Sequence, residues 1–210
     1  MIRQSFFDTN LNMTFLELAK KRRSIRLFQQ GKDVPDEYIK KILEAGNLAP
    51  SAHNKQSWKF VVIKGKKKDE LSKLITELSE LFPKKSRLLL RMGAKSIFTA
   101  PCVIAVFSTG ELVSEAGDYG EELKKEIEDF FLEMEIQSAS AAVQNMLLQA
   151  TELGLGSVWL GVVVLVARQI ESFLGVEGKL LAMFPIGYPS KDYTPPKKKP
   201  LSEVVIEIKD

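Results

Sequence analysis

The sequence predicts a single domain that combines α-helices with β-strands. Three observations support this prediction: segments with helical spacing of apolar residues alternate with short apolar runs, the chain has 210 residues, and it contains no internal repeat. Hydrophobic residues make up 45% and charged residues 27%, as in an ordinary globular protein. The predicted domain spans residues 1–210, with a C-terminal arm from about residue 193, and a partner subunit could complete its core.

The predicted helices follow from capping residues and apolar spacing. Thr14 and Glu17 fit a capping box, and Phe15, Leu18 and Ala19 give the first helix its apolar face. Further helices are predicted over residues 35–48, 69–82, 87–98, 121–153 and 168–174.

The predicted strands are short runs rich in β-branched and aromatic residues. Residues 102–107 form an unbroken apolar run, which is typical of a strand buried on both faces. The other strands are predicted at residues 58–63, 157–160, 180–186 and 204–208. The proline- and lysine-rich segment 195–200 predicts an extended arm.

Charge, cysteine content and apolar runs argue against several classes of protein. The net charge of +3 is small and the basic residues lie in separated clusters, so nucleic-acid binding is not expected. The single cysteine, Cys102, cannot form an internal disulfide and favours a reducing compartment. No apolar run approaches the roughly 20 residues of a membrane span, and the polar N-terminus lacks the apolar stretch of a signal peptide. We therefore expect a cytoplasmic protein.

The first candidate site is a cationic cluster just after the first helix. Arg22, Arg23 and Arg26 surround Ser24, so fixed charges and hydrogen-bond donors are concentrated in one short segment. Such a cluster suits a phosphate or another compact anion. The alternative is a solvated basic helix end, because lysines and arginines favour helix C-termini.

The second candidate site is the loop that follows Pro50. Ser51, Asn54 and Gln56 place neutral hydrogen-bonding side chains beside a tryptophan, as a planar ligand with polar edges requires. The alternative is a simple turn, since Pro, Ser and Asn favour turns for local backbone reasons. His53 is the only histidine, so a histidine-based metal site or a Ser-His-Asp triad is not expected.

Two segments nearer the C-terminus complete the candidates. The glycine-containing stretch 154–161 fails the dinucleotide fingerprint, because position 159 is tryptophan and a helix precedes the glycines. It predicts a helix cap followed by a strand. Lys198 lies in the basic segment 195–201, whose alternative interpretation is an exposed linker.

These four segments together resemble the flavin-binding motifs of the nitroreductase family, in the family's order, from residue 15 to residue 205. The resemblance implies an α+β fold with a central, mostly antiparallel sheet flanked by helices. It also implies an intertwined homodimer that binds two FMN molecules at the subunit interface. FMN is expected rather than FAD, because the cations converge on one terminal phosphate and no adenine-binding fingerprint is present.

The resemblance also implies roles for individual residues. The cationic cluster and Lys198 would bind the phosphate and the N1/O2 edge of the flavin, the loop after Pro50 would reach the flavin from the opposite subunit, and backbone groups near residue 160 would lie along the ring. No catalytic side chain and no metal ligand are implied. The implied cofactor-binding residues are Arg22, Arg23, Ser24, Arg26, Pro50, Ser51, Ala52, Asn54, Trp159, Leu160, Gly161 and Lys198.

Two positions depart from the family's pattern. Ser57 replaces the usual proline before Trp58, which removes no ligand-contacting group. Gly161 stands where some members carry a glutamate, so side-chain control of the pocket is not expected there.

The predicted long helix favours a large apolar interface, because its apolar residues lie on more than one side. A helix buried within one subunit is the alternative. The apolar residues are Ile127, Phe130, Phe131, Met134, Ala141, Ala142, Met146 and Leu148.

The activity that the resemblance implies is transfer of a hydride from NAD(P)H through FMN to an electron-poor acceptor, such as a nitroaromatic or a quinone, by a ping-pong mechanism. Two alternatives remain. One is a different flavin reaction on the same fold, such as flavin destruction or reductive dehalogenation, for which only residues 108–120 could form a short lid. The other is a non-catalytic flavin-binding or storage protein.

Overall fold

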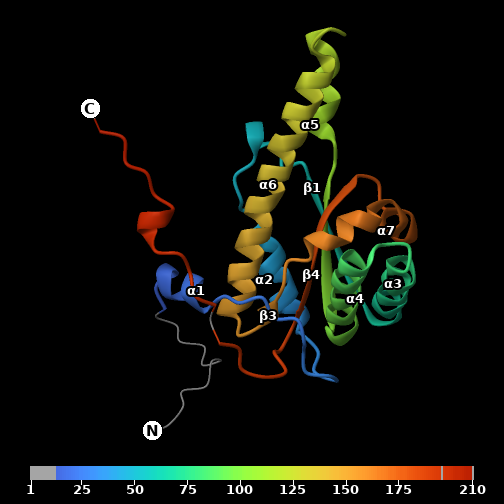
Figure 1. Cartoon of the computed structure of the whole chain (residues 1–210), viewed down its shortest axis with the longest axis vertical. Helices are drawn as coiled ribbons and strands as arrows, with labels where there is room; N and C mark the ends of the chain where they lie inside the picture. Colours follow the sequence, from blue (N-terminus) through green and yellow to red (C-terminus); the bar gives the residue numbers. More distant parts are fainter. Residues whose placement is uncertain (1–12, 195, 210) are drawn as a thin grey trace.

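The computed structural model describes residues 13–194 and 196–209 as a four-stranded sheet with helices on both faces (Figure 1). Every strand pair is antiparallel and the strand order is β1-β2-β4-β3. The predicted α+β fold with a mostly antiparallel sheet is confirmed. The strands are β1 (Trp58–Lys64), β2 (Cys102–Ser108), β3 (Gly156–Ser157) and β4 (Lys179–Gly187).

The helices fall into two groups on opposite faces of the sheet (Figure 1). The α-helices are α1 (Phe15–Lys21), α2 (Asp36–Asn47), α3 (Gly65–Ser79), α4 (Lys84–Thr99), α5 (Glu111–Ser114), α6 (Lys124–Glu152) and α7 (Ala167–Leu174). The 3-10 helices are η1 (Ala52–Asn54), η2 (Glu115–Tyr119), η3 (Gly161–Val166) and η4 (Leu201–Glu203).

Strand β2 lies at the centre of the core and is buried along its whole length. Its side chains alternate between the two faces of the sheet, as the period of a strand requires. Ile104 and Val106 pack with the residues of α2 and α6, whereas Val103 and Phe107 pack with those of α3, α4 and α7. The sequence prediction of a strand buried on both faces is confirmed.

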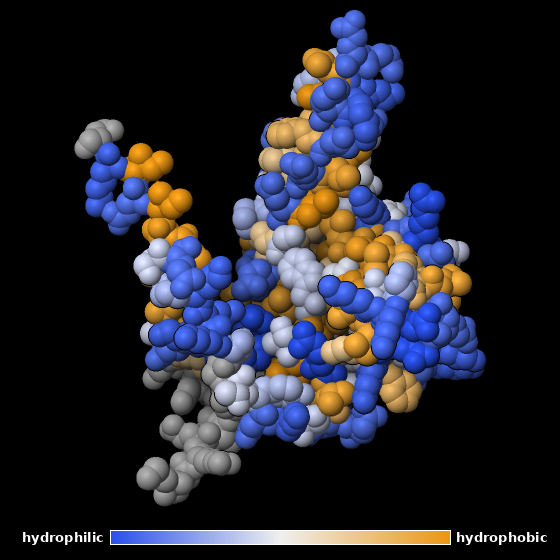
Figure 2. Space-filling view, viewed as in Figure 1, coloured by the Kyte–Doolittle hydropathy of each residue, from blue (hydrophilic) through white to orange (hydrophobic). Residues whose placement is uncertain are grey.

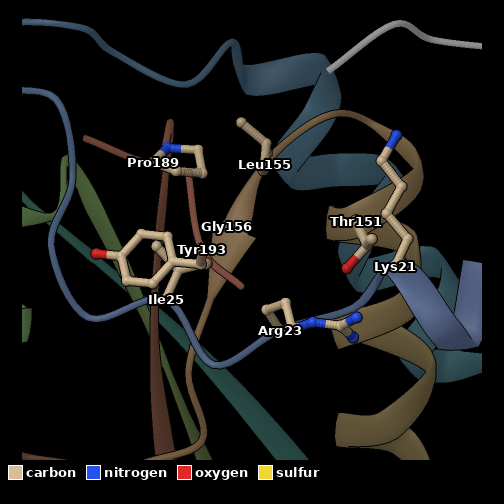
Figure 3. A pocket seen from close by; sticks show the side chains of 8 residues that line it. All are labelled: Lys21, Arg23, Ile25, Thr151, Leu155, Gly156, Pro189 and Tyr193. Atoms are coloured by element: carbon tan, nitrogen blue, oxygen red, sulfur yellow. The ribbon is translucent and has the colours of Figure 1, made fainter. Parts of the chain in front are cut away.

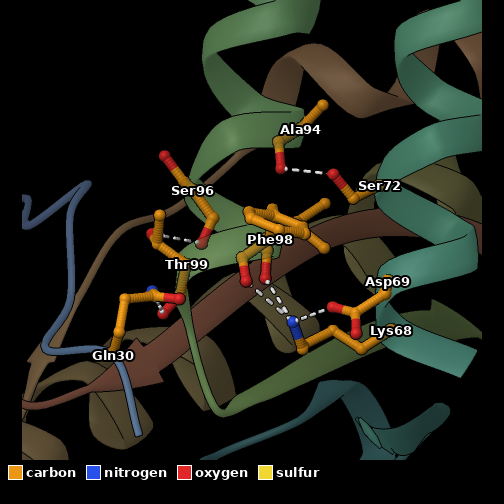
Figure 4. Close-up of polar contacts among 9 residues, drawn as sticks. Gln30, Lys68, Asp69, Ser72, Ala94, Ser96, Phe98 and Thr99 are labelled. Carbon is orange, nitrogen blue, oxygen red and sulfur yellow. Dashed lines mark hydrogen bonds and ion pairs between the residues drawn. The ribbon is translucent and has the colours of Figure 1, made fainter. Parts of the chain in front are cut away.

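A buried lysine joins α3 to the end of α4 (Figure 4). The Nζ atom of Lys68 donates to the carbonyl oxygen of Phe98 at 2.8 Å and lies 2.5 Å from Oδ1 of Asp69. It thereby satisfies a carbonyl group that has no partner within α4. The helix predicted from residue 69 begins at Gly65 in the structure, so Lys68 lies within α3.

Several predicted boundaries were wrong. Helix α4 begins at Lys84 rather than residue 87, and α6 begins at Lys124 rather than residue 121. The predicted strand 157–160 is reduced to β3 and one isolated bridge between Leu160 and Met183. The 3-10 helix η3 and the short helices α5 and η2 were not predicted, because their apolar residues follow neither a clear helical nor a clear strand period.

The predicted strand 204–208 is absent from the described structure, where η4 leads into an irregular segment. Alternating valine and isoleucine provide the side-chain pattern of a strand, but a strand also needs the hydrogen-bonding edge of a neighbour. No described segment pairs with residues 204–209. Pro195 of the predicted arm lies outside the described residues. Within the described part of the chain, the helices are all too short or too polar to cross a membrane.

Candidate functional site

The cationic cluster after α1 is held by the edge of the sheet. The N–H of Ile25 donates to the carbonyl oxygen of Ser157 at 2.9 Å, and Ser24 forms a parallel bridge with Ser157. The side chain of Ile25 is buried, with 5% exposed. Because successive side chains of an extended segment point to opposite sides, Ser24 and Arg26 lie on the exposed side.

A glycine makes this attachment possible. A Cβ atom added at Gly156 would lie 2.8 Å from side-chain atoms of Ile25. Any larger residue at position 156 would therefore push the arginine segment away from the sheet. Gly156 thus contributes to the site by letting the arginine segment pack closely against β3. The glycines of this stretch do not form a dinucleotide fingerprint.

The cationic cluster opens into a cavity of about 810 Å³, which lies within the range of roughly 300–1,000 Å³ typical of small-molecule sites. Residues from the C-terminal segment, including Lys198, form its opposite wall. Among the described residues, no carboxylate side chain lines the cavity. The lining residues are Ala19, Lys20, Arg22, Arg23, Ser24, Arg26, Tyr193, Thr194, Pro196 and Lys198. The structure therefore brings Lys198 to the three arginines from more than 170 positions away in the sequence.

The electrostatics of this cavity favour an anion. The pKa of Arg22 is lowered, mainly by burial and additionally by the positive charge of Arg23. Both effects destabilise the charged form of Arg22. Among the described residues, no carboxylate forms an ion pair with Arg22, Arg23 or Arg26. A bound phosphate would supply the missing negative charge and accept their hydrogen bonds.

Arg23 lines the large cavity and also borders a second, smaller one. Its Nη1 atom donates to the carbonyl oxygen of Arg22 at 2.7 Å, and its buried Nε atom has no hydrogen-bond partner among the described residues. It also lines a cavity of about 30 Å³ with Lys21, Thr151 and Tyr193 (Figure 3). A cavity of this size holds one water molecule, which could satisfy the unpaired nitrogen.

The loop after Pro50 is shaped by its own hydrogen bonds. The hydroxyl oxygen of Ser51 accepts from the N–H of Gln56 at 2.9 Å. His53, Asn54 and Gln56 have φ values of 50°, 55° and 51°, a left-handed conformation that residues other than glycine seldom adopt. Three strained residues within four positions indicate a loop whose shape is fixed by the surrounding structure.

The loop is attached to the middle of α6, far from the cationic cluster. The N–H of Ala52 donates to Oγ of Ser138 at 3.1 Å, whereas Arg23 lies beside Thr151 on the same helix. Ser138 and Thr151 are 13 positions apart, which corresponds to about 20 Å along an α-helix. The structure therefore does not bring Pro50, Ser51, Ala52 and Asn54 to the arginines of the same chain.

The third predicted segment continues from β3 beside the arginines. The N–H of Leu160 donates to the carbonyl oxygen of Met183 at 2.8 Å and is thus occupied by the sheet. Gly161 is exposed and begins η3, and the first N–H groups of a helix have no partner within it. The backbone N–H of Gly161 is therefore better placed than that of Leu160 to meet a ligand, and the half-exposed ring of Trp159 adjoins it.

Two polar residues on α6 that were not predicted from the sequence hold the neighbouring segments in place. Ser138 anchors the loop, and the carboxylate of Glu135 accepts from the hydroxyl of Ser108 at the end of β2 and from two N–H groups at the start of α5. Their positions follow Phe131 at helical spacing, on the face that continues to the buried Ala142. A polar residue in register with a buried stripe was the pattern that could have identified them.

Comparison with known proteins agrees with this geometry. The sequence profile described as the nitroreductase family matches residues 19–188. A "putative NADH dehydrogenase/NAD(P)H nitroreductase" of Methanothermobacter thermautotrophicus is 32% identical over 86% of this chain and 80% of its own length. The iodotyrosine deiodinase of Hydra vulgaris is 33% identical over 89% of this chain and 70% of its own.

A solved structure gives the same result for the fold. The crystal structure of a "putative nitroreductase in complex with FMN" from Desulfovibrio desulfuricans superposes with a TM-score of 0.68. It is 30% identical and the match covers 92% of this chain and 96% of that one. The order of elements, the cation-lined cavity and the matched length all lead to one conclusion: this chain belongs to the nitroreductase family.

Proposed function

We propose that this protein is an FMN-dependent oxidoreductase that transfers a hydride from NAD(P)H to an electron-poor acceptor, such as a nitroaromatic or a quinone, by a ping-pong mechanism. One observation carries the proposal. Arg22, Arg26 and Lys198 line one cavity of about 810 Å³, and no carboxylate in the described part of the chain lines it with them. The single buried cysteine, Cys102, suits a cytoplasmic location.

The residues present fit FMN. Arginine side chains donate in pairs to phosphate oxygens, and Lys198 adds a point charge from the C-terminal segment. The hydroxyl of Ser24 adds a further donor at the same wall. The cations line one cavity, which would suit the single terminal phosphate of FMN rather than FAD.

The protein's own contribution is binding, orientation and electrostatics. When bound, FMN supplies the redox chemistry by accepting a hydride from the nicotinamide and passing it on. The arginine cluster would bind the phosphate and the N1/O2 edge of FMN, where its positive charge would stabilise the negative charge that develops on reduction. The backbone N–H of Gly161 would donate to the ring, and the loop after Pro50 would orient its polar edge. No side chain is assigned as a general acid or base.

We further propose that each site is shared between two subunits of a homodimer. The loop after Pro50 and the cationic cluster lie about 20 Å apart along α6 in one chain, so both can reach one flavin only across an interface. Apolar side chains left exposed on α6 and on the C-terminal arm (residues 193–209) support such an interface. Phe130 is 51% and Ile206 is 90% exposed. The arm extends away from the sheet, and its outer part, from Leu201 to Ile208, carries exposed apolar residues (Figures 1 and 2).

A second candidate function is reductive dehalogenation of an aromatic substrate. The observation that favours it is the identity of 33% with the iodotyrosine deiodinase of Hydra vulgaris and of 29% with that of Homo sapiens, over about nine-tenths of this chain. The segment from Thr109 to Gly120, with α5 and η2, is the short lid available for such a substrate. A non-catalytic flavin-binding role is the remaining alternative.

One set of measurements separates these functions. The flavin should be released by heat as FMN, whereas recovery of FAD at one per subunit would contradict the cofactor assignment. NADH or NADPH should bleach the bound flavin under anaerobic conditions, and a nitroaromatic or quinone should restore its colour. Absence of bleaching with both nucleotides would favour the non-catalytic role. Restoration by an iodinated phenol but not by nitroaromatics or quinones would favour dehalogenation.

A further inference from the structure

Glu135 is a buried carboxylate that the proposed chemistry does not use. It lies on α6 and is 0% exposed. Its carboxylate accepts hydrogen bonds from the hydroxyl of Ser108, from the N–H of Gly110 at 3.2 Å and from the N–H of Leu112 at 2.7 Å. No lysine or arginine among the described residues forms an ion pair with it. Oriented donors from residues 108–112 therefore replace the water that a buried carboxylate loses.

The next turn of the same helix holds the loop after Pro50. Ser138 lies three positions after Glu135, so the two side chains occupy neighbouring positions on one side of α6. Oγ of Ser138 accepts from the N–H of Ala52 at 3.1 Å and donates to the carbonyl oxygen of Met134 at 2.7 Å. One stretch of α6 thus fixes both the start of the 109–120 segment and the loop that is proposed to reach the flavin.

The 109–120 segment and the loop also contact each other directly. Nζ of Lys55 lies 2.5 Å from Oε1 of Glu115, and both side chains are about one-third exposed. Ala52 packs against the buried cluster of Leu112, Ala116 and Phe131. The segment, the loop and α6 therefore form one closed set of contacts in which Glu135 is the buried polar link.

We propose that Glu135 is a positioning residue for the proposed reaction: it fixes residues 109–120 against the loop as the wall of the pocket that the electron acceptor enters. This inference rests on the proposed function, because the loop must border the flavin. Because Glu135 is fully buried and its carboxylate accepts from three protein donors, it would act without touching cofactor or acceptor. Its loss should loosen the wall and weaken acceptor binding, while FMN remains held by the arginines and Lys198.

The first test needs no flavin. Hydrogen–deuterium exchange of the full chain should be compared between the wild type, Glu135→Gln and the control Glu133→Gln, which changes an exposed glutamate on the same helix. Exchange at Gly110 and Leu112 should accelerate by about tenfold or more in Glu135→Gln only, as expected when a charge-assisted hydrogen bond is lost. Equal exchange in the two variants would overturn the proposal. If Glu135→Gln does not fold, Glu135→Asp withdraws the carboxylate from the same two N–H groups, and the same comparison of exchange rates decides.

The second test uses the FMN-loaded enzyme. In Glu135→Gln the KM for the acceptor should rise by about tenfold while FMN affinity stays within about twofold of wild type, a pattern of lost substrate positioning. Faster exchange without any change in KM would reject the functional role of Glu135. If the wild-type protein binds flavin but shows no turnover with any acceptor, the proposed function is rejected. The exchange result would still report on the structural role of Glu135, because it does not depend on activity.

Discussion

The two halves of the proposed flavin site are built in opposite ways. The arginine segment is attached to the sheet: Ile25 is buried and hydrogen-bonded to Ser157, and the cations beside it have no carboxylate partner among the described residues. The loop after Pro50 is held by hydrogen bonds within the loop and to α6, which keep three of its residues in left-handed conformations. The first half carries cations without a carboxylate partner among the described residues, whereas the second half has a fixed shape that presents neutral polar side chains. Binding energy should therefore come mostly from the arginines, and orientation from the loop.

The largest effect should follow from removing the unpaired charge. Arg22→Ala or Arg26→Ala should weaken FMN binding by about 10- to 150-fold, because a hydrogen bond to a charged group contributes roughly 1.5–3 kcal/mol. Arg22→Lys should recover only part of this loss if the contact is bidentate. Isothermal titration of the apoprotein with FMN measures the change. Arg168→Ala, at an exposed position on α7, is the control. Unchanged FMN affinity in both cluster variants would favour the alternative interpretation, in which the cluster is only a solvated helix end.

An intermediate effect should follow from separating the arginine segment from the sheet. Gly156→Ala places a Cβ atom 2.8 Å from Ile25 and should lower the free energy of unfolding by about 1–3 kcal/mol, the usual range for overpacking. FMN affinity should fall in the same variant, because the segment that carries the arginines must move. Denaturant titration gives the stability. Gly117→Ala is the matched control, since nothing lies within 4 Å of its added Cβ. Equal stability of the two variants would show that the attachment is not tight.

The smallest effect should come from the strained loop. His53→Gly should raise the free energy of unfolding by up to about 1 kcal/mol, because a left-handed conformation is unfavourable for other residues and the greater freedom of unfolded glycine offsets part of the gain. FMN affinity should stay unchanged if His53 contributes only its backbone. His53→Ala retains the unfavourable φ of 50° and should not stabilise. Destabilisation by His53→Gly would mean that the imidazole makes contacts that hold the loop.

The same contrast explains what could be predicted from the sequence. Helix α2 and strands β1, β2 and β4 follow from local apolar periodicity, and their predicted positions agree with the structure within a few residues. Lys198 and Arg22 line the same cavity although they lie far apart in the sequence, and only the family resemblance could suggest this. Glu135 was missed because an acidic residue within a helix is usually exposed, and its donors, at residues 108–112, depend on a fold not visible in the pattern.

The strand predicted at residues 204–208 shows the limit of local patterns most clearly. Val204, Ile206 and Ile208 alternate as in a strand, but all three are exposed and no described segment supplies a pairing edge. Side-chain alternation predicts which face of a segment would be buried, but it does not identify the neighbouring strand with which the segment would pair. The proposed homodimer offers such a partner.

A mixed dimer tests the shared site most directly. One subunit carries Arg22→Ala and Arg26→Ala, and the other carries Ser51→Ala and Asn54→Ala. If each flavin is held by the arginines of one subunit and the loop of the other, the mixed dimer contains one site with all four changes and one intact site. Because of the intact site, it should recover about half of the wild-type activity, while both mutant homodimers keep low activity. FMN binding and dimer assembly would also be linked. If the arginines and the loop of one chain serve the same site, every site is damaged and no activity returns, which would contradict the account.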